Sequence, residues 1–200
     1  MPGLIGIVLL FQGMQSSLSI VYDQEMGVMR LLLTAPLPRW YLLLCKLIAG
    51  VILSAGQVYA FLLLAAVFGI FLPLTGWLFV LPAMLAAGFM LGSLGLVFSV
   101  HIRQIENFAG MMNFVIFPMF FLSSALYPLW RLEESGATVI YWLSLINPFT
   151  HVVEMVRFSI YGHFNLVSTT VVVACGFAFF MIAVAGFDPQ RGVFRRRSRG

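Results

Sequence analysis

Apolar stretches of about twenty residues, repeated along the chain, constrain its fold more than any other feature. Five such runs can be delimited, at residues 3–21, 47–72, 77–100, 108–126 and 166–187. A helix needs about 20 apolar residues to cross the ~30 Å hydrocarbon core of a bilayer. No Asp, Glu, Lys or Arg lies in the middle of any run. The pattern predicts an all-α, polytopic helical membrane protein with about five transmembrane helices, forming a single transmembrane domain over residues 1–200.

Composition excludes a soluble globular domain. The chain is 62% hydrophobic and 9% charged, whereas soluble domains carry about a quarter of charged residues. The two cysteines, Cys45 and Cys175, lie at the edge of one run and inside another. This placement indicates no disulfide framework.

A polar segment, residues 22–46, separates the first two runs. A charge at bilayer depth costs about 2.5–3.5 kcal/mol on insertion scales, so this segment must lie in water or at the membrane edge. Wound as a helix, it places on one stripe Asp23, Gly27, Arg30 and Thr34. Asp23 would lie at the N-terminal end, where the helix dipole favours an anion, and Pro36 and Pro38 would end the helix. We expect a short amphipathic helix that offers a partner a soluble face; the alternative is a plain solvated loop.

The basic residues predict the orientation in the membrane. If five spans alternate, the segment 22–46, the turn 101–107 and the basic tail 188–200 fall on one side. By the positive-inside rule that side is the cytoplasm, so the C-terminus is expected inside and the N-terminus outside. The opposite side receives the outer segment 127–165, in which three glutamates outnumber two arginines.

The outer segment is expected to form a helix pair. Residues 137–146 are apolar but too short to span the membrane. Asn147 and Pro148 then predict a helix start, an N-cap followed by proline at the first helical position, and Gly162 is placed to end that helix. Its apolar face would hold Phe149, Val152, Val153, Val156 and Ile160, and its other face Thr150, His151, Glu154, Arg157 and Tyr161. Both an interfacial and a re-entrant hairpin fit this pattern.

Uncharged polar residues follow one flank of each of the first two runs. The first carries Gln12 and Ser16, with Gln15 adjacent, and the second carries Gln57. Amides and hydroxyls at membrane depth need partners, either on another helix or in a wet cavity. Packing between helices is one interpretation. The other is a translocation path lined by Gln12, Gln15, Ser16 and Gln57.

The third run contains a seam of small residues. Its members, at 4-3-4 spacing, are Gly88, Gly92, Gly95 and Ser99. Such a small-residue seam lets another helix backbone approach closely. We therefore expect a packing surface here.

Motifs of several enzyme classes are missing. There is no GxxxxGK[ST] loop for a nucleotide, no HExxH or CxxC motif for a metal, and the three histidines lie in different segments. No His or Lys inside a span could activate Ser123 or Ser124, which disfavours an intramembrane serine protease. No catalytic, cofactor-binding or metal-binding residue is predicted. Since ionisable groups for a coupling ion are also absent from the spans, energy for uphill transport would have to come from another chain.

Three stretches resemble one family of membrane proteins. FQGMQSSLSIVYDQEMGVMRLLLTAPLPRWYLLLCKLIAG resembles the permeases of the ABC type 2 family, which are drug, polysaccharide and lipo-oligosaccharide exporters. SALYPLWRLEESG and NPFTHVVEMVRFSIYG resemble the outer hairpin that precedes the last span of that family. The resemblance covers essentially the whole chain. It implies a permease subunit that forms a homodimer or pseudo-dimer and docks a cytosolic ABC ATPase subunit.

The resemblance also implies site residues and a location. It places Asp23, Glu25, Gly27 and Arg30 in a coupling helix that Pro36 ends, and we expect these five residues to couple the chain to the ATPase. ATP and Mg would bind to the partner, with no cofactor in this chain. The expected surroundings are the lipids of a bacterial cytoplasmic (inner) membrane, with no nucleic-acid partner. The alternative function is a non-transporting membrane scaffold that anchors a cytosolic partner.

The family differs from this chain in the number of spans. It has six spans and a cytoplasmic N-terminus, whereas five runs are found here. We therefore expect in-frame coding sequence upstream that supplies a further N-terminal span.

Overall fold

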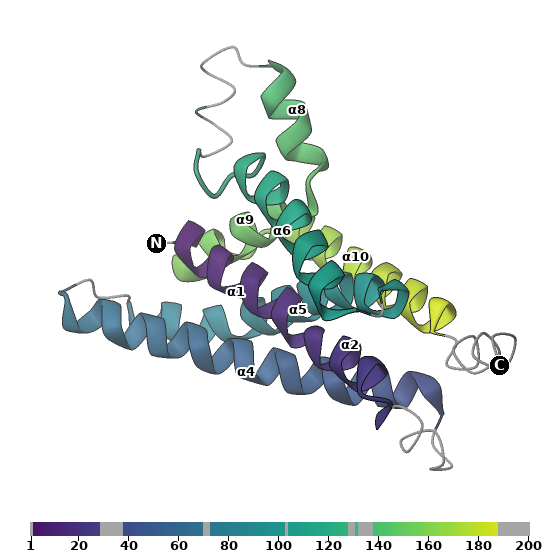
Figure 1. Cartoon of the computed structure of the whole chain (residues 1–200). Helices are drawn as coiled ribbons and strands as arrows, with labels where there is room; N and C mark the ends of the chain where they lie inside the picture. The colour runs from purple at the N-terminus through teal and green to yellow at the C-terminus, as the bar shows by residue number, and fades with distance from the viewer. Residues whose placement is uncertain are drawn as a thin grey trace, which may run out of the picture.

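The computed structural model describes residues 2–28, 38–69, 73–102, 104–127, 131 and 138–187. Within these ranges the regular elements are helices, and the expected all-α fold is confirmed. They are α1 (Pro2–Ser16), α2 (Leu18–Glu25), α4 (Arg39–Val67), α5 (Leu74–His101), α6 (Ile105–Phe121), α8 (Thr138–Ile146), α9 (Pro148–Ile160) and α10 (Leu166–Gly186). Figure 1 shows that the helices form a bundle. α4 lies along one side of this bundle, and α8 projects away from the bundle.

Four stretches of helix in this part of the chain are long and apolar enough to cross a membrane. They are Pro2–Glu25, Trp40–Val67, Gly76–His101 and Leu166–Gly186. The chain is therefore a multi-pass helical membrane protein, as its sequence predicts. The run expected at 108–126 forms most of α6, which has 17 residues. At 1.5 Å per residue α6 is about 26 Å long, slightly shorter than a ~30 Å hydrocarbon core.

The helices on both sides of the polar segment extend further into it than expected. α1 and α2 meet at Ser17 and together reach Glu25, beyond the predicted end at residue 21. α4 begins at Arg39 instead of residue 47, directly after Pro38, which has an extended backbone (φ −66°, ψ 141°). Proline is suited to this boundary because its ring fixes φ and it has no N–H to satisfy. The polar segment is thus flanked by helix on each side.

α5 is the centre of the bundle, because α1, α4, α9 and α10 all pack against it. A Cβ on Gly92 would lie 2.6 Å from Leu47 Cδ1 of α4, and one on Gly95 would lie 2.5 Å from Ser17 Oγ. A Cβ on Gly95 would also lie 3.1 Å from the Gly13 carbonyl, so the backbones of α1 and α5 approach closely here and the packing surface predicted from the small-residue seam is confirmed. Ser17 Oγ also donates a hydrogen bond to the Gly92 carbonyl (3.2 Å), which ties α5 to the start of α2.

The bundle has two ends that serve as landmarks. At the α2 end, α2 and α5 end while α4 and α6 begin, and the last turn of α10 lies against His101. At the α9 end, α1 and α10 begin while α4 and α6 end, and Gly3 lies against the Ala125 carbonyl. The α2 end is on the right in Figure 1.

α8 and α9 form a hairpin with a bend of 84° between its helices. Asn147 caps α9 by accepting a hydrogen bond from the Phe149 backbone N–H (3.0 Å), and Pro148 is the first helical residue. Gly162 follows the end of α9 with φ +72°. The helix start and the helix stop predicted from the sequence are both confirmed.

The two helices of the hairpin differ in burial. α8 buries Ser144 and is otherwise largely exposed, whereas the predicted apolar face of α9 is buried against α1, α5 and α10. The opposite face of α9 is partly buried as well: Thr150 is 0% and Glu154 8% exposed, whereas Tyr161 at its end is 70% exposed. Periodicity identified which face packs on the core, but it could not show that other parts of the chain cover the second face.

Candidate functional site

The end of α2 is held to α4 by an ion pair. The Asp23 carboxylate pairs with Lys46 Nζ. Lys46 also donates to the Ser19 carbonyl at 3.4 Å. Asp23 lies near the C-terminal end of α2, so its expected place at a helix N-terminus is wrong. A carboxylate near a helix C-terminus is disfavoured by the dipole, and the Lys46 ammonium offsets this cost.

The next two residues hold α2 to two other helices. Gln24 Nε2 donates to the Ser99 carbonyl of α5 at 3.4 Å. Glu25 Oε2 accepts from the Ile105 backbone N–H at 3.0 Å, and Ile105 is the first residue of α6. Three consecutive side chains of α2 therefore contact Lys46 in the third turn of α4, Ser99 near the end of α5 and the first residue of α6. None of these contacts is visible in the sequence pattern, because each depends on how the helices are arranged.

The polar segment does not continue from α2 as one helix. α2 ends at Glu25, and Gly27 has φ +75°. Glycine adopts this left-handed torsion without a Cβ clash, and it commonly ends an α-helix. The continuous helical stripe expected through Gly27 is therefore wrong. The other members of that expectation, Arg30, Thr34 and Pro36, lie outside the described residues, as does the basic tail 188–200.

The residues that were expected to line a translocation path lie in different environments in the structure. Ser16 Oγ donates to the Gly13 carbonyl (2.9 Å), and a Cβ on Gly50 of α4 would lie 2.6 Å from Ser16 Cβ. Ser16 thus lies in the contact between α1 and α4. Gln12 is half-buried, whereas Gln15 and Gln57 are exposed.

A second polar cluster covers α9. Arg157 forms an ion pair with Glu154 and donates from Nη2 to the Ser124 carbonyl at 3.0 Å. Ser124 Oγ donates to the Thr150 carbonyl at 3.4 Å. The turn that follows α6 therefore covers the polar face of α9, and the ion pair compensates the burial of the Glu154 carboxylate.

Asn147 links α9 to the end of α6. Its Nδ2 donates to the Met119 carbonyl (2.7 Å) and the Leu122 carbonyl (3.1 Å). The last carbonyls of a helix have no partner within the helix, and the amide nitrogen of an asparagine has two donors. Sequence reasoning identified Asn147 as a cap but missed this second role, which its spare donors indicated.

These clusters bind and position helices. Within the ranges that the structure describes, no group of three or more His, Cys, Asp or Glu residues could hold a metal ion. The arrangement joins elements that are far apart in the sequence.

Comparison with known proteins identifies relatives of the chain. A sequence model of the family described as ABC-2 type transporter matches residues 1–161. The protein named Putative transport permease ycf38, from Cyanophora paradoxa, is 29% identical over 172 residues, covering 81% of this chain and 55% of that protein. The chain thus spans about half the length of this relative. The region matched by the family model includes the polar segment and the hairpin.

Proposed function

The chain belongs to the ABC-2 type transporter family, and on this premise we propose that it is the membrane-spanning permease subunit of an ATP-binding-cassette exporter. It moves a solute across the cytoplasmic membrane. The ATP is hydrolysed by a separate cytosolic subunit that docks on residues 22–46.

The observation that carries the proposal is the triple attachment of α2. Asp23, Gln24 and Glu25 contact α4, α5 and α6 through an ion pair and two hydrogen bonds. These three residues belong to the polar segment 22–46. A partner that displaces this segment therefore acts on α4, α5 and α6 by direct contact. A plain solvated loop has no need of such attachments.

The charge distribution and the missing nucleotide site support a cytosolic energy source. Basic residues concentrate in the segments 22–46, 101–107 and 188–200. α2, α5 and α10 end and α4 and α6 begin at the α2 end, so the positive-inside rule supports a cytoplasmic position for that end. The sequence has no Walker loop. We infer that ATP binds to the partner subunit, which docks at the α2 end of the bundle, where the polar segment begins.

Exposed amides support a second permease subunit. Gln15 of α1 and Gln57 of α4 are exposed on helices long enough to span the membrane. An amide in contact with lipid lacks hydrogen-bond partners, whereas a second subunit or a wet path between subunits supplies them. Gln12, Gln15 and Gln57 are our candidates for lining that path, whereas Ser16 is engaged in packing.

ATP hydrolysis in membranes tests this function. The tagged chain is purified from its native membrane with the ABC ATPase that accompanies it, and both are reconstituted into lipid vesicles. We expect no hydrolysis by the chain alone and a partner rate that changes several-fold when the chain is present. Hydrolysis by the chain alone contradicts the proposal, and a bound partner whose rate does not respond to the chain favours the scaffold function.

A further inference from the structure

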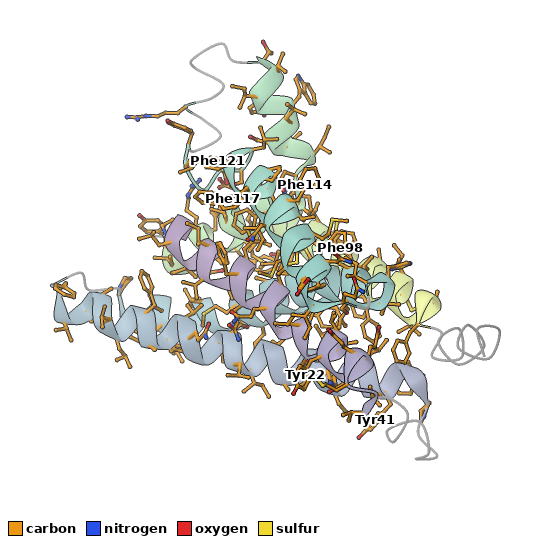
Figure 2. The ribbon with its side chains drawn as sticks, in the orientation of Figure 1. Tyr22, Tyr41, Phe98, Phe114, Phe117 and Phe121 are labelled. Carbon is orange, nitrogen blue, oxygen red and sulfur yellow. The ribbon has the colours of Figure 1, made fainter. Side chains whose placement is uncertain are left out.

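α6 is covered by few neighbours along its length. Phe108 and Ile116 are its buried residues. Phe114, Phe117 and Phe121 are 76%, 50% and 60% exposed, and Figure 2 shows them along the outer side of α6. One face of α6 packs against the core through Ile116, Met112, Val115, Met119 and Phe120, and the face that carries the three exposed phenylalanines has no such packing in this part of the chain.

The N-terminal end of α6 is capped from another helix. Its own N-cap residue, Gln104, makes no side-chain cap hydrogen bond, and Gln104 Oε1 instead accepts from Asn107 Nδ2 (2.7 Å). Glu25 of α2 supplies the acceptor for the Ile105 N–H, at 3.0 Å. A carboxylate at this place satisfies one of the free N–H groups and also interacts favourably with the helix dipole.

The C-terminal end of α6 is held by α9. Asn147 Nδ2 donates to the Met119 and Leu122 carbonyls. Arg157 donates to the Ser124 carbonyl in the turn that follows α6. α6 is therefore joined to α2 at one end and to α9 at the other, while much of its side surface is exposed.

We propose that Glu25 and Asn147 are positioning residues that hold the two ends of α6, so that α6 transmits a displacement of α2 to the buried helix α9. A helix that is packed along one face and held by hydrogen bonds at its ends can still tilt or shift slightly along its axis. The hydrogen bonds at each end then pass the shift to the next element. This inference rests on the proposed function, because the ATPase partner supplies the displacement.

The experiment measures the movement of α9 in the complex of the full chain with its ABC ATPase. Nitroxide labels are attached at Phe158→Cys on α9 and Leu63→Cys on α4, both exposed positions, after replacement of Cys45 and Cys175. The distance between the labels is measured by pulsed electron resonance in lipid nanodiscs, without nucleotide and with ATP and vanadate. ATP hydrolysis is measured on the same samples.

Matched substitutions distinguish transmission from a general effect on folding. In the labelled chain without further substitutions, we expect the distance to shift when ATP and vanadate are added. Glu25→Ala should abolish this shift. Glu25→Gln should restore it, because its amide oxygen can still accept a hydrogen bond from the Ile105 N–H. The control Glu106→Ala removes an exposed carboxylate from the first turn of α6, leaves the Glu25 contact with Ile105 in place, and should keep the shift. Asn147→Asp, which keeps the α9 cap but loses the donor to α6, should lose the shift as Glu25→Ala does.

The outcomes separate this inference from the function on which it rests. If Glu25→Ala keeps the shift, or if Glu106→Ala loses it equally, transmission through α6 is wrong while the ATPase measurement still supports a transporter. A complex that never hydrolyses ATP overturns the proposed function and this inference together.

Discussion

Helices α5 and α6 follow each other in the chain and are both apolar, but they are held in place differently. α5 packs against α1, α4, α9 and α10, with Gly92 and Gly95 at points of close approach. α6 exposes most of its aromatic side chains, and the hydrogen bonds described above hold its ends. In a bilayer, apolar residues gain little by leaving lipid, so close packing and polar contacts decide which helices associate. We infer that close packing fixes the position of α5, whereas α6 can be displaced.

The largest expected effect comes from filling the small-residue seam. Gly95→Leu should destabilise the fold by about 3 kcal/mol or more, since overpacking in a tight core costs about 1–3 kcal/mol and sometimes more. A Cβ at Gly95 would already lie 2.5 Å from Ser17 Oγ and 3.1 Å from the Gly13 carbonyl. Thermal unfolding in detergent, followed by the reaction of the half-buried Cys175 with a thiol dye after replacement of the exposed Cys45, measures the change.

Gly110 of α6 is the matched control for this substitution. A Cβ at Gly110 would meet nothing within 4 Å. Gly110→Leu should therefore be neutral, or stabilising by up to about 1 kcal/mol through helix propensity. Equal destabilisation by the two substitutions would contradict the distinction between α5 and α6.

Removing aromatic rings should have the next largest effect. Phe149 of α9 is 0% exposed and packs in the core around α5, whereas Phe114 of α6 is 76% exposed. Phe149→Ala should cost about 1–3 kcal/mol, less than in a soluble core because lipid also solvates the ring, so that mainly the cavity term remains. Phe114→Ala should change the free energy of unfolding by less than ~0.5 kcal/mol. A large loss at Phe114 would mean that α6 is packed along its side.

A smaller effect is expected at the junction between α6 and α9. Asn147→Ala removes an N-cap, which costs about 0.5–2 kcal/mol in other helices, together with the donors to the Met119 and Leu122 carbonyls. Asn147→Asp keeps the cap and should recover about half of the loss. The same unfolding measurement checks both variants, and no recovery by Asp would show that the contact with α6 dominates.

Local features were predictable from the sequence. The membrane runs, the small-residue seam and the boundaries of α9 at Asn147 and Gly162 all follow from short-range patterns: apolar run length, residue size and cap chemistry. These patterns act within a few residues. They do not depend on how the helices are arranged, and the structure therefore agrees with the predictions made from them.

The connections between helices could not be predicted in this way. Glu25 contacts Ile105 across 80 residues of sequence, and no local pattern contains that pairing. Gly27 was interpreted as part of a helical stripe because polar spacing continues through it. Its lack of a side chain was the available sign of a helix end. The burial of Glu154 likewise depends on the turn after α6, which a helical face pattern cannot reveal.

In the proposed function a cytosolic ATPase drives the bundle through residues 22–46, so the affinity of that ATPase for the chain is the decisive quantity. Binding is measured on vesicles that hold either the unchanged chain or Arg30→Glu, over a range of salt concentrations. Since charges at the rim of an interface control association and its salt dependence, we expect weaker, less salt-sensitive binding for Arg30→Glu, with normal membrane insertion. Equal affinity and equal ATP turnover for both chains would contradict the proposed function.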